Sequence, residues 1–186
     1  MRSTLGWTGT CAAATLATLA AVAGHAEDEA KYSVSVPGGL SFSEFKGYES
    51  WETIAISRGD RLMAVILGNP VMIEAYKAGV PVNGQPFPDG ARMAKIHWTP
   101  KPLEAFPTTA VPGELHDVDF MVKDAARFAD SGGWGYAAFI YEPSSGTFRP
   151  GNSGDQPPQA NDAKCGFACH TVAKGRDYVF TEYGKR

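Results

Sequence analysis

The sequence has little basic charge, few histidines and few cysteines, and beyond residue 26 it has no long hydrophobic run. Its formal net charge is −3 at pH 7, and no segment is rich in lysine and arginine. A nucleic-acid partner is therefore not expected, because binding to phosphates needs a basic patch. The longest apolar run after residue 26 covers only 62–67, which is too short for a helix that crosses a bilayer.

The first 26 residues have the order of a secretory signal peptide. Arg2 is their only charged residue, an apolar stretch covers 11–23, and Gly24 and Ala26 place small residues before an acidic segment. This order predicts cleavage after Ala26 and a periplasmic or secreted protein. A membrane anchor is the alternative, but the stretch is short and rich in Ala and Thr. The remainder, 27–186, has a length suited to a single domain.

Export changes the meaning of the few cysteines. Cys11 leaves with the signal peptide, so Cys165 and Cys169 are the only thiols of the exported chain. Two thiols this close together do not normally stay free in an oxidising compartment. They are expected to form a disulfide, bind a metal or attach a cofactor.

Hydrophobic patterning between turn residues predicts more strands than helices. The expected strands are 51–58, 61–67, 91–98, 116–123 and 135–142. The expected helices are short: 70–78 after the N-cap Asn69, 124–130, the cysteine segment, and 177–183, with a polar loop over 150–164. Because the connections between strands are short, we predict an α+β fold, a predominantly antiparallel β-sheet with a few short packed helices.

Two of these strands alternate in a way that assigns their side chains to faces. In 91–98, one face carries Met93, Lys95 and His97, and the other carries Ala94, Ile96 and Trp98. In 116–123, one face carries Asp117, Asp119, Met121 and Lys123, and the other carries His116, Val118, Phe120 and Val122. A lysine in such a pattern usually faces solvent, so the pattern alone predicts an exposed Lys95.

The stretch at 164–175, "KCGFACHTVAKG", holds both cysteines and a histidine as C-x-x-x-C-H. The haem-attachment signature of c-type cytochromes is one residue shorter, C-x-x-C-H. On a helix the extra residue rotates Cys165 by about 100° and shifts it by about 1.5 Å, which leaves it near the same face. His170 still follows the second cysteine directly, and Gly166 can absorb the adjustment of the backbone. Haem attachment is therefore compatible with the longer spacing.

Two other interpretations of this stretch stay open. A disulfide between Cys165 and Cys169 would close a very small loop and leave His170 exposed. A structural zinc site is weaker, because it needs four ligands and the exported chain offers only His97 and His116 besides this stretch.

Several segments together resemble the cytochrome P-460 family. They are "NPVMIEAYKAGVPVNGQPFPDGARMAKIHW", "LHDVDFMVKDAARFADSGGWGYAAF", "CGFACH" and "DYVFTEYGKR", in this order, and the resemblance covers about 51–186. It implies an exported c-type haem protein built on a mostly antiparallel sheet, with the haem attached near the C-terminus. The family's activities are hydroxylamine oxidation in some members and nitric oxide binding in a related cytochrome c′-beta branch.

The resemblance also implies the residues that hold one covalent haem c. Cys165 and Cys169 would form the thioether bonds, and His170 would be the proximal ligand of the iron. The P-460 enzymes of the family also have a lysine bonded to the porphyrin ring, in the strand that leaves the "PFPDG" turn. Lys95 occupies that place in this chain.

The side of the haem opposite His170 has several candidate residues. A sixth iron ligand is expected, if there is one, among Met63, Met72, Met93, Met121, His97 and His116. Core packing is the simpler interpretation for the methionines. Asp117 or Asp119 would supply a carboxylate that accepts protons from hydroxylamine, or else they are solvated residues at a strand edge.

Three functions follow as hypotheses. The first is a periplasmic redox enzyme that oxidises hydroxylamine or a related small nitrogen compound and passes electrons to a soluble periplasmic acceptor. The second is a haem protein that binds nitric oxide or another small gas without turnover. The third is a haem-free binding module with a disulfide. No stable membrane anchor is expected, and a homodimer is an open alternative.

Overall fold

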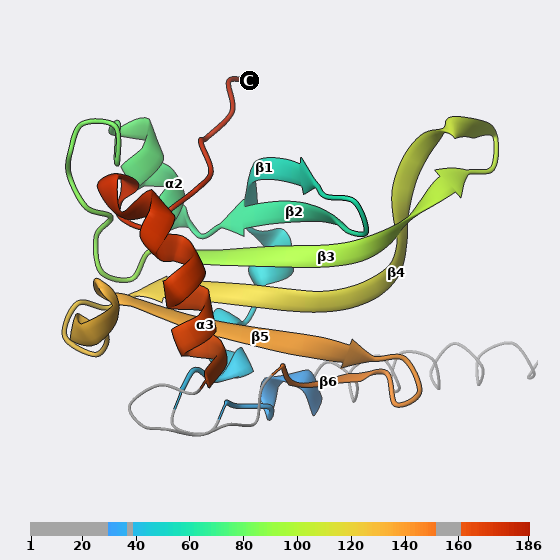
Figure 1. Cartoon of the computed structure of the whole chain (residues 1–186), viewed down its shortest axis with the longest axis horizontal. Coiled ribbons are helices and arrows are strands. Elements are labelled where there is room, and N and C mark those ends of the chain that lie inside the picture. Colours follow the sequence, from blue (N-terminus) through green and yellow to red (C-terminus); the bar gives the residue numbers. More distant parts are fainter. Residues whose placement is uncertain (1–29, 37–38, 152–160) are drawn as a thin grey trace, which may run out of the picture.

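The computed structural model describes residues 30–36, 39–151 and 161–186. The predicted signal peptide, 1–26, lies outside these residues, as does most of the predicted polar loop. At the centre is one antiparallel sheet whose neighbouring strands follow the order of the chain (Figure 1). The strands are β1 Glu52–Arg58, β2 Met63–Gly68, β3 Arg92–Leu103, β4 Phe106–Lys123, β5 Trp134–Glu142 and β6 Thr147–Pro150. The predicted α+β fold with a predominantly antiparallel sheet is confirmed. None of the helices described here is long and apolar enough to cross a bilayer.

The two central strands run beyond their predicted ends and form an arm that projects from the sheet (Figure 1). Pro100 of β3 stands opposite Pro112 of β4 in this arm. Proline cannot donate a hydrogen bond to a neighbouring strand, which argues against a strand in a sequence. The two-stranded arm tolerates prolines because no other strand of the described residues pairs with its outer edges.

One face of the sheet packs against the N-terminal segment. Two short 3-10 helices, η1 Phe42–Phe45 and η2 Tyr48–Ser50, lie on this face. The ring of Phe45 stacks on that of Phe120 at 4.0 Å between centroids, and Phe42 meets the same ring edge-on at 5.1 Å. Ala94, Val118 and Val122 join this core, as the alternation predicted.

The opposite face carries the other helices and the C-terminal segment. Helix α2 is Pro70–Lys77, and the side chain of Asn69 caps it by accepting from the N–H of Met72 at 3.0 Å, which confirms the predicted start. Helix α3, Asn161–His170, continues into the 3-10 helix η4, Thr171–Arg176. In Figure 1, α3 crosses the sheet in front of β5. Met93, Met121 and Tyr136 of the sheet belong to the core on this face.

Three local predictions are wrong. The segment 124–130 is a turn that leads into the short 3-10 helix η3, Ala129–Ser131, because the chain must return at once to β5. The segment 177–183 has no helix, since it starts with two residues of positive φ, Asp177 and Tyr178. Residues 161–164 of the predicted loop already belong to α3.

His116 also departs from its predicted face. His97 pairs with Asp117 and the next residue, Trp98, pairs with Leu115, which leaves His116 as an extra residue in β4. Such a bulge breaks the alternation of side chains. The side chain of His116 is therefore 48% exposed and does not share the core of Val118.

Candidate functional site

A cavity of about 660 Å³ lies between the second face of the sheet, α3 and the C-terminal segment. Four of the residues predicted as site residues line it: Lys95 from β3, Asp119 from β4, and Cys169 and His170 from α3. The rest of the lining is mainly apolar, and it includes Ile66, Met93, Met121, Ala137 and Val179. The fold thus brings together residues that are 75 positions apart in sequence, from Lys95 to His170.

His170 has one nitrogen committed and the other available. Its Nδ1 lies 2.6 Å from the backbone carbonyl oxygen of Tyr178. A carbonyl can only accept a hydrogen bond, so Nδ1 carries the proton and Nε2 keeps its lone pair. This is the tautomer that binds a metal through Nε2.

The charge state of His170 fits the same role. Burial lowers the pKa of His170, and the ammonium group of Lys95 lowers it further, against the hydrogen bond to Tyr178, which raises it. The net pKa lies below the ordinary value of 6.5. The imidazole is therefore neutral at neutral pH, as a metal ligand must be.

Helix α3 brings the cysteine segment against the sheet. Gly166 allows the close approach, since a Cβ atom at this position would lie 2.9 Å from Cβ and Cγ of Tyr136. That Gly166 also eases the longer cysteine spacing stays a prediction. Cys169 is a free, exposed thiol. Cys165 lies four residues earlier on the same regular helix, and its side chain is outside the described residues.

Lys95 does not point to open solvent as its strand pattern alone predicts. It is half-buried in the cavity lining, and it stands directly opposite Asp119 in the pairing of β3 with β4. Among the described residues, its ammonium group makes no hydrogen bond and no ion pair within 4 Å. Because it has no hydrogen bond of its own among the described residues, the Lys95 side chain is available to bind a group in the cavity.

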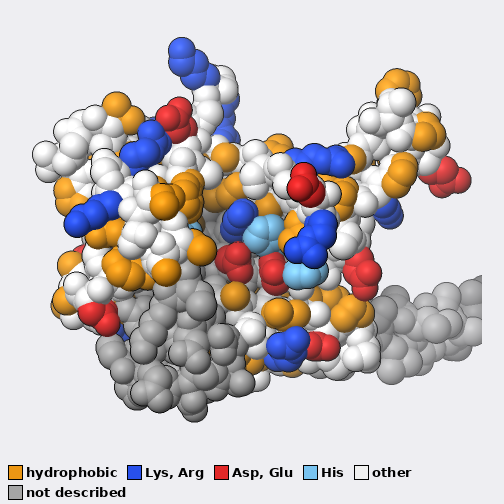
Figure 2. Space-filling model, viewed as in Figure 1, with side chains coloured by type: hydrophobic (Ala, Val, Ile, Leu, Met, Phe, Trp, Pro, Cys, Tyr) orange, Lys and Arg blue, Asp and Glu red, His pale blue; other side chains and the backbone are white. Residues whose placement is uncertain are grey.

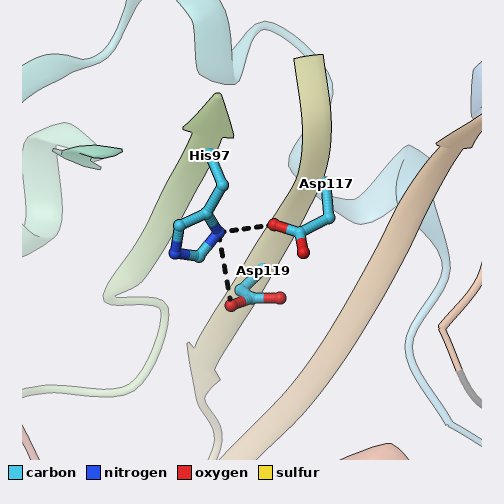
Figure 3. A group of neighbouring side chains, drawn as sticks. All are labelled: His97, Asp117 and Asp119. Carbon is cyan, nitrogen blue, oxygen red and sulfur yellow. Dashed lines mark hydrogen bonds and ion pairs between the residues drawn. The ribbon is translucent and has the colours of Figure 1, made fainter. Parts of the chain in front are cut away.

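The two aspartates of β4 have different surroundings. Asp119 lines the cavity, whereas Asp117 does not. Asp117 accepts hydrogen bonds from Nδ1 of His97 at 2.5 Å and from Nδ1 of His116 at 2.8 Å. Figure 3 shows the same nitrogen of His97 facing both carboxylates, and its distance to Oδ2 of Asp119 is 3.8 Å. Charged side chains and histidines gather over this part of the sheet in Figure 2.

These contacts give Asp117 and Asp119 different pKa values. Burial raises the pKa of the Asp117 carboxyl, but the hydrogen bonds and charges of His97 and His116 outweigh burial and lower it below its usual range. Burial raises the pKa of Asp119 to about 6, and the nearby Asp117 carboxylate adds to the rise. Two carboxyl groups whose pKa values are pushed apart are typical of an acid–base site.

The candidate sixth ligands are also sorted by the fold. Met93 and Met121 line the cavity, whereas Met72 is fully buried in the core. The other three candidates, Met63, His97 and His116, do not line the cavity. Of the candidate sixth ligands, only Met93 and Met121 therefore line the cavity in the part of the chain that the structure describes.

Sequence reasoning missed three contributors to this cavity. The hydroxyl group of Tyr136 is buried and has no hydrogen-bond partner among the described residues, and its ring lies 5.2 Å from that of His170. The ring centroid of Phe180 lies 4.7 Å from that of the same imidazole. The carbonyl of Tyr178 could not be recognised, because every residue has a carbonyl and only the fold aims this one at His170.

The residues present fit a covalently held haem. The cavity has the volume of a cofactor site and a mainly apolar lining. It offers the lone pair of a neutral imidazole and the adjacent free thiol of Cys169. The buried hydroxyl of Tyr136 would find its missing partner in a polar group of a bound ligand.

Comparison with known proteins agrees with this geometry. No curated protein sequence matches the chain. The family model described as Cytochrome P460 matches residues 45–181, which contain all six strands, α3 and the cavity residues named above. This chain belongs to the cytochrome P460 family, a family of c-type haem proteins.

Proposed function

We propose that the chain is an exported mono-haem c-type cytochrome that oxidises hydroxylamine or a related small nitrogen compound. The observation that carries the proposal is the meeting of Lys95 and His170 in one cavity. Lys95 makes no hydrogen bond and no ion pair among the described residues, and the hydrogen bond from Nδ1 to Tyr178 leaves the lone pair of Nε2 on His170 available. A haem whose iron is bound by a histidine and whose porphyrin ring is bonded to a lysine requires these two residues in one cavity.

The proposed holding of the haem uses four residues. Cys165 and Cys169 form the thioether bonds, His170 binds the iron through Nε2, and Lys95 bonds to the porphyrin ring. When bound, the haem would supply the redox chemistry that the oxidation of a nitrogen compound needs. The mainly apolar lining offers few hydrogen bonds to water that would compete with the small substrate.

Asp119 is the proposed proton acceptor. Oxidation of hydroxylamine releases protons as well as electrons, so a base in the cavity speeds the reaction. With a pKa of about 6, the carboxyl of Asp119 is mostly ionised at neutral pH and still binds a proton readily. Asp117 does not take this part, because its two oxygens already accept hydrogen bonds from histidines.

The deciding experiment is an absorption spectrum of the purified wild type and of Lys95→Ala, both from a host that attaches haem c. A lysine bonded to the ring changes its conjugation, so the wild type is expected to absorb at longer wavelength than an ordinary c-type cytochrome. Lys95→Ala is expected to load haem, to show the ordinary spectrum and to lose hydroxylamine oxidation. Lys101→Ala, a change on the same strand outside the cavity, is the matched control.

Two results would contradict the proposal at different levels. A colourless wild-type protein without haem stain on a denaturing gel would refute haem attachment. A coloured wild type with the same spectrum as Lys95→Ala would refute the bond from Lys95, and hydroxylamine oxidation would lose its support.

Nitric oxide binding without turnover is the second candidate. The mainly apolar lining of the cavity favours it, because a small uncharged gas needs few polar contacts. It becomes the first candidate if Lys95 proves not to be bonded to the ring. Titration of the reduced protein with nitric oxide, followed by absorbance, measures this binding.

The place and partners of the protein are part of the same proposal. The chain is exported by its first 26 residues, and residues 27–186 work as one haem domain in the periplasm or outside the cell. Electrons pass to a soluble periplasmic acceptor, and neither nucleic acid nor a stable membrane anchor takes part. Size-exclusion chromatography of the haem-loaded protein decides whether two copies form a homodimer.

A further inference from the structure

A buried ion pair outside the cavity joins the end of β4 to the C-terminal segment. Nζ of Lys123 lies 2.8 and 3.0 Å from the two carboxylate oxygens of Asp177. The side chains are only 7% and 12% exposed. Lys123 also donates to the carbonyl of Gly132 at 3.0 Å and lies over the ring of Trp134. A buried charge pair of this kind must be well satisfied to be tolerated, and here it is.

The pair holds a turn that the backbone would not adopt by itself. Asp177 and Tyr178 have φ values of 48° and 64°, in the left-handed region. A residue other than glycine adopts this region at a cost in free energy, so its surroundings must stabilise it there. Besides Lys123, Asp177 accepts from the N–H of Phe87 at 2.8 Å, which fixes its carboxylate from a second direction.

Tyr178 is fixed on the same turn. Its N–H donates to the carbonyl of Ala173 at 2.9 Å. Its ring lies where a side chain at 132 would stand, since a Cβ atom on Gly132 would be 2.2 Å from Cε2 of Tyr178. The result of these contacts is a carbonyl that meets Nδ1 of His170 at 2.6 Å.

We infer that Lys123 and Asp177 are positioning residues for His170, because they fix the turn whose carbonyl accepts the hydrogen bond from its Nδ1. The inference rests on the proposed binding of the haem iron by His170. In addition, Lys123 at the C-terminal end of β4 would influence how strongly His170 donates electrons to the iron.

The physical consequence concerns the iron. A hydrogen bond from Nδ1 to a fixed acceptor orients the ring and makes Nε2 a stronger electron donor. A stronger donor favours the oxidised iron and lowers the reduction potential. Loss of the fixed acceptor should therefore raise the potential and weaken the bond from iron to His170.

The test replaces both charges at once, because removing one would leave the other buried and unpaired. In Lys123→Met/Asp177→Asn the volumes are nearly kept, and asparagine tolerates the left-handed conformation at 177. The matched control is Lys77→Met/Glu74→Gln, which removes an exposed pair at 2.9 Å by the same chemical changes. Thermal melting and the ratio of haem to protein are recorded for both proteins.

Two further measurements decide the inference. The first is the midpoint potential, and the second is the iron–histidine stretching frequency of the reduced protein by resonance Raman spectroscopy. The buried double variant is expected to load haem, with a more positive potential and a lower frequency. The control is expected to match the wild type in both.

A folded, haem-loaded double variant with wild-type potential and frequency would overturn the inference. If this variant does not fold, Lys123→Met/Asp177→Gly takes its place, because glycine adopts a positive φ without strain. Should that protein also fail to load haem while the control does, the pair is a general folding determinant and the positioning role is overturned. Neither measurement depends on turnover, so a wild type that binds haem without oxidising hydroxylamine refutes only the proposed activity.

Discussion

At the scale of single residues, two carboxyl groups on one strand differ in what they can do. Asp117 is held by two histidines, whereas Asp119 faces the cavity with a raised pKa. They are separated by a single residue in sequence, and sequence alone gave both the same candidate role. The difference arises from their neighbours, and it can be tested by the dependence of activity on pH.

The first prediction concerns the ionisation of Asp119. Hydroxylamine oxidation by the wild type is expected to fall as the pH drops through about 6, since a protonated carboxyl cannot accept a proton. Asp119→Asn should lose about 100-fold or more in rate at neutral pH, and its remaining activity should not fall near pH 6. Asp60→Asn, in the exposed turn after β1, is the control. A fall near pH 6 that persists in Asp119→Asn would assign it to another group.

The second prediction concerns Asp117 as a neighbour. Its carboxylate raises the pKa of Asp119, so Asp117→Asn should lower that pKa and shift the acidic limb of the activity profile to lower pH. The measurement is the midpoint of that limb in wild type and variant. A midpoint that stays in place or moves upward would show that the Asp117 carboxylate does not raise the pKa of Asp119.

At the scale of elements, helix α3 depends on a close approach to β5. In Gly166→Ala the new methyl group meets the buried Tyr136, and overpacking of this kind costs about 1–3 kcal/mol. The melting temperature should fall by about 2–4 °C for each kcal/mol lost. Gly175→Ala is the matched control, because nothing lies within 4 Å of a Cβ atom there. Equal melting temperatures of the two variants would contradict the contact.

Helix α3 also predicts which cysteine matters more for haem loading. Cys169 lines the cavity next to His170, so Cys169→Ala should reduce haem loading more than Cys165→Ala. Haem stain per unit protein on denaturing gels measures the difference. The opposite order would mean that the first cysteine, despite the longer spacing, forms the main attachment.

At the scale of the whole molecule, cleavage of the signal peptide and covalent attachment of one haem together predict the mass of the mature protein. The intact protein from a host with haem c maturation should begin at Glu27 and carry the mass of a single haem that denaturation does not remove. Mass spectrometry of the denatured protein measures both features together. A mass that includes residues 1–26 would refute cleavage, and a mass without haem would refute covalent attachment.

Much of the fold could be predicted because the patterns that carry it are local. Alternation in β3 and β4 placed Ala94 and Val118 in one core and Met93 and Met121 in the other. The side chain of Asn69 fixed the start of α2 through its own hydrogen bonds. The projecting arm and the bulge at His116 were not predictable, because prolines and a change of register become acceptable only through the partner strand.

The sequence by itself determined which chemical groups are available: a histidine directly after the second of two cysteines, a lysine in an alternating strand, and two aspartates in the next strand. Only the tertiary structure decided how they act. It gathered Lys95, Asp119 and His170 around one cavity, and it separated Asp117 from Asp119 by the hydrogen bonds of two histidines. The tautomer of His170 depends on a backbone carbonyl at Tyr178, which has no signature in sequence. The physical reason is that side-chain patterns follow from neighbours along the chain, whereas proton position and acid strength follow from neighbours in space.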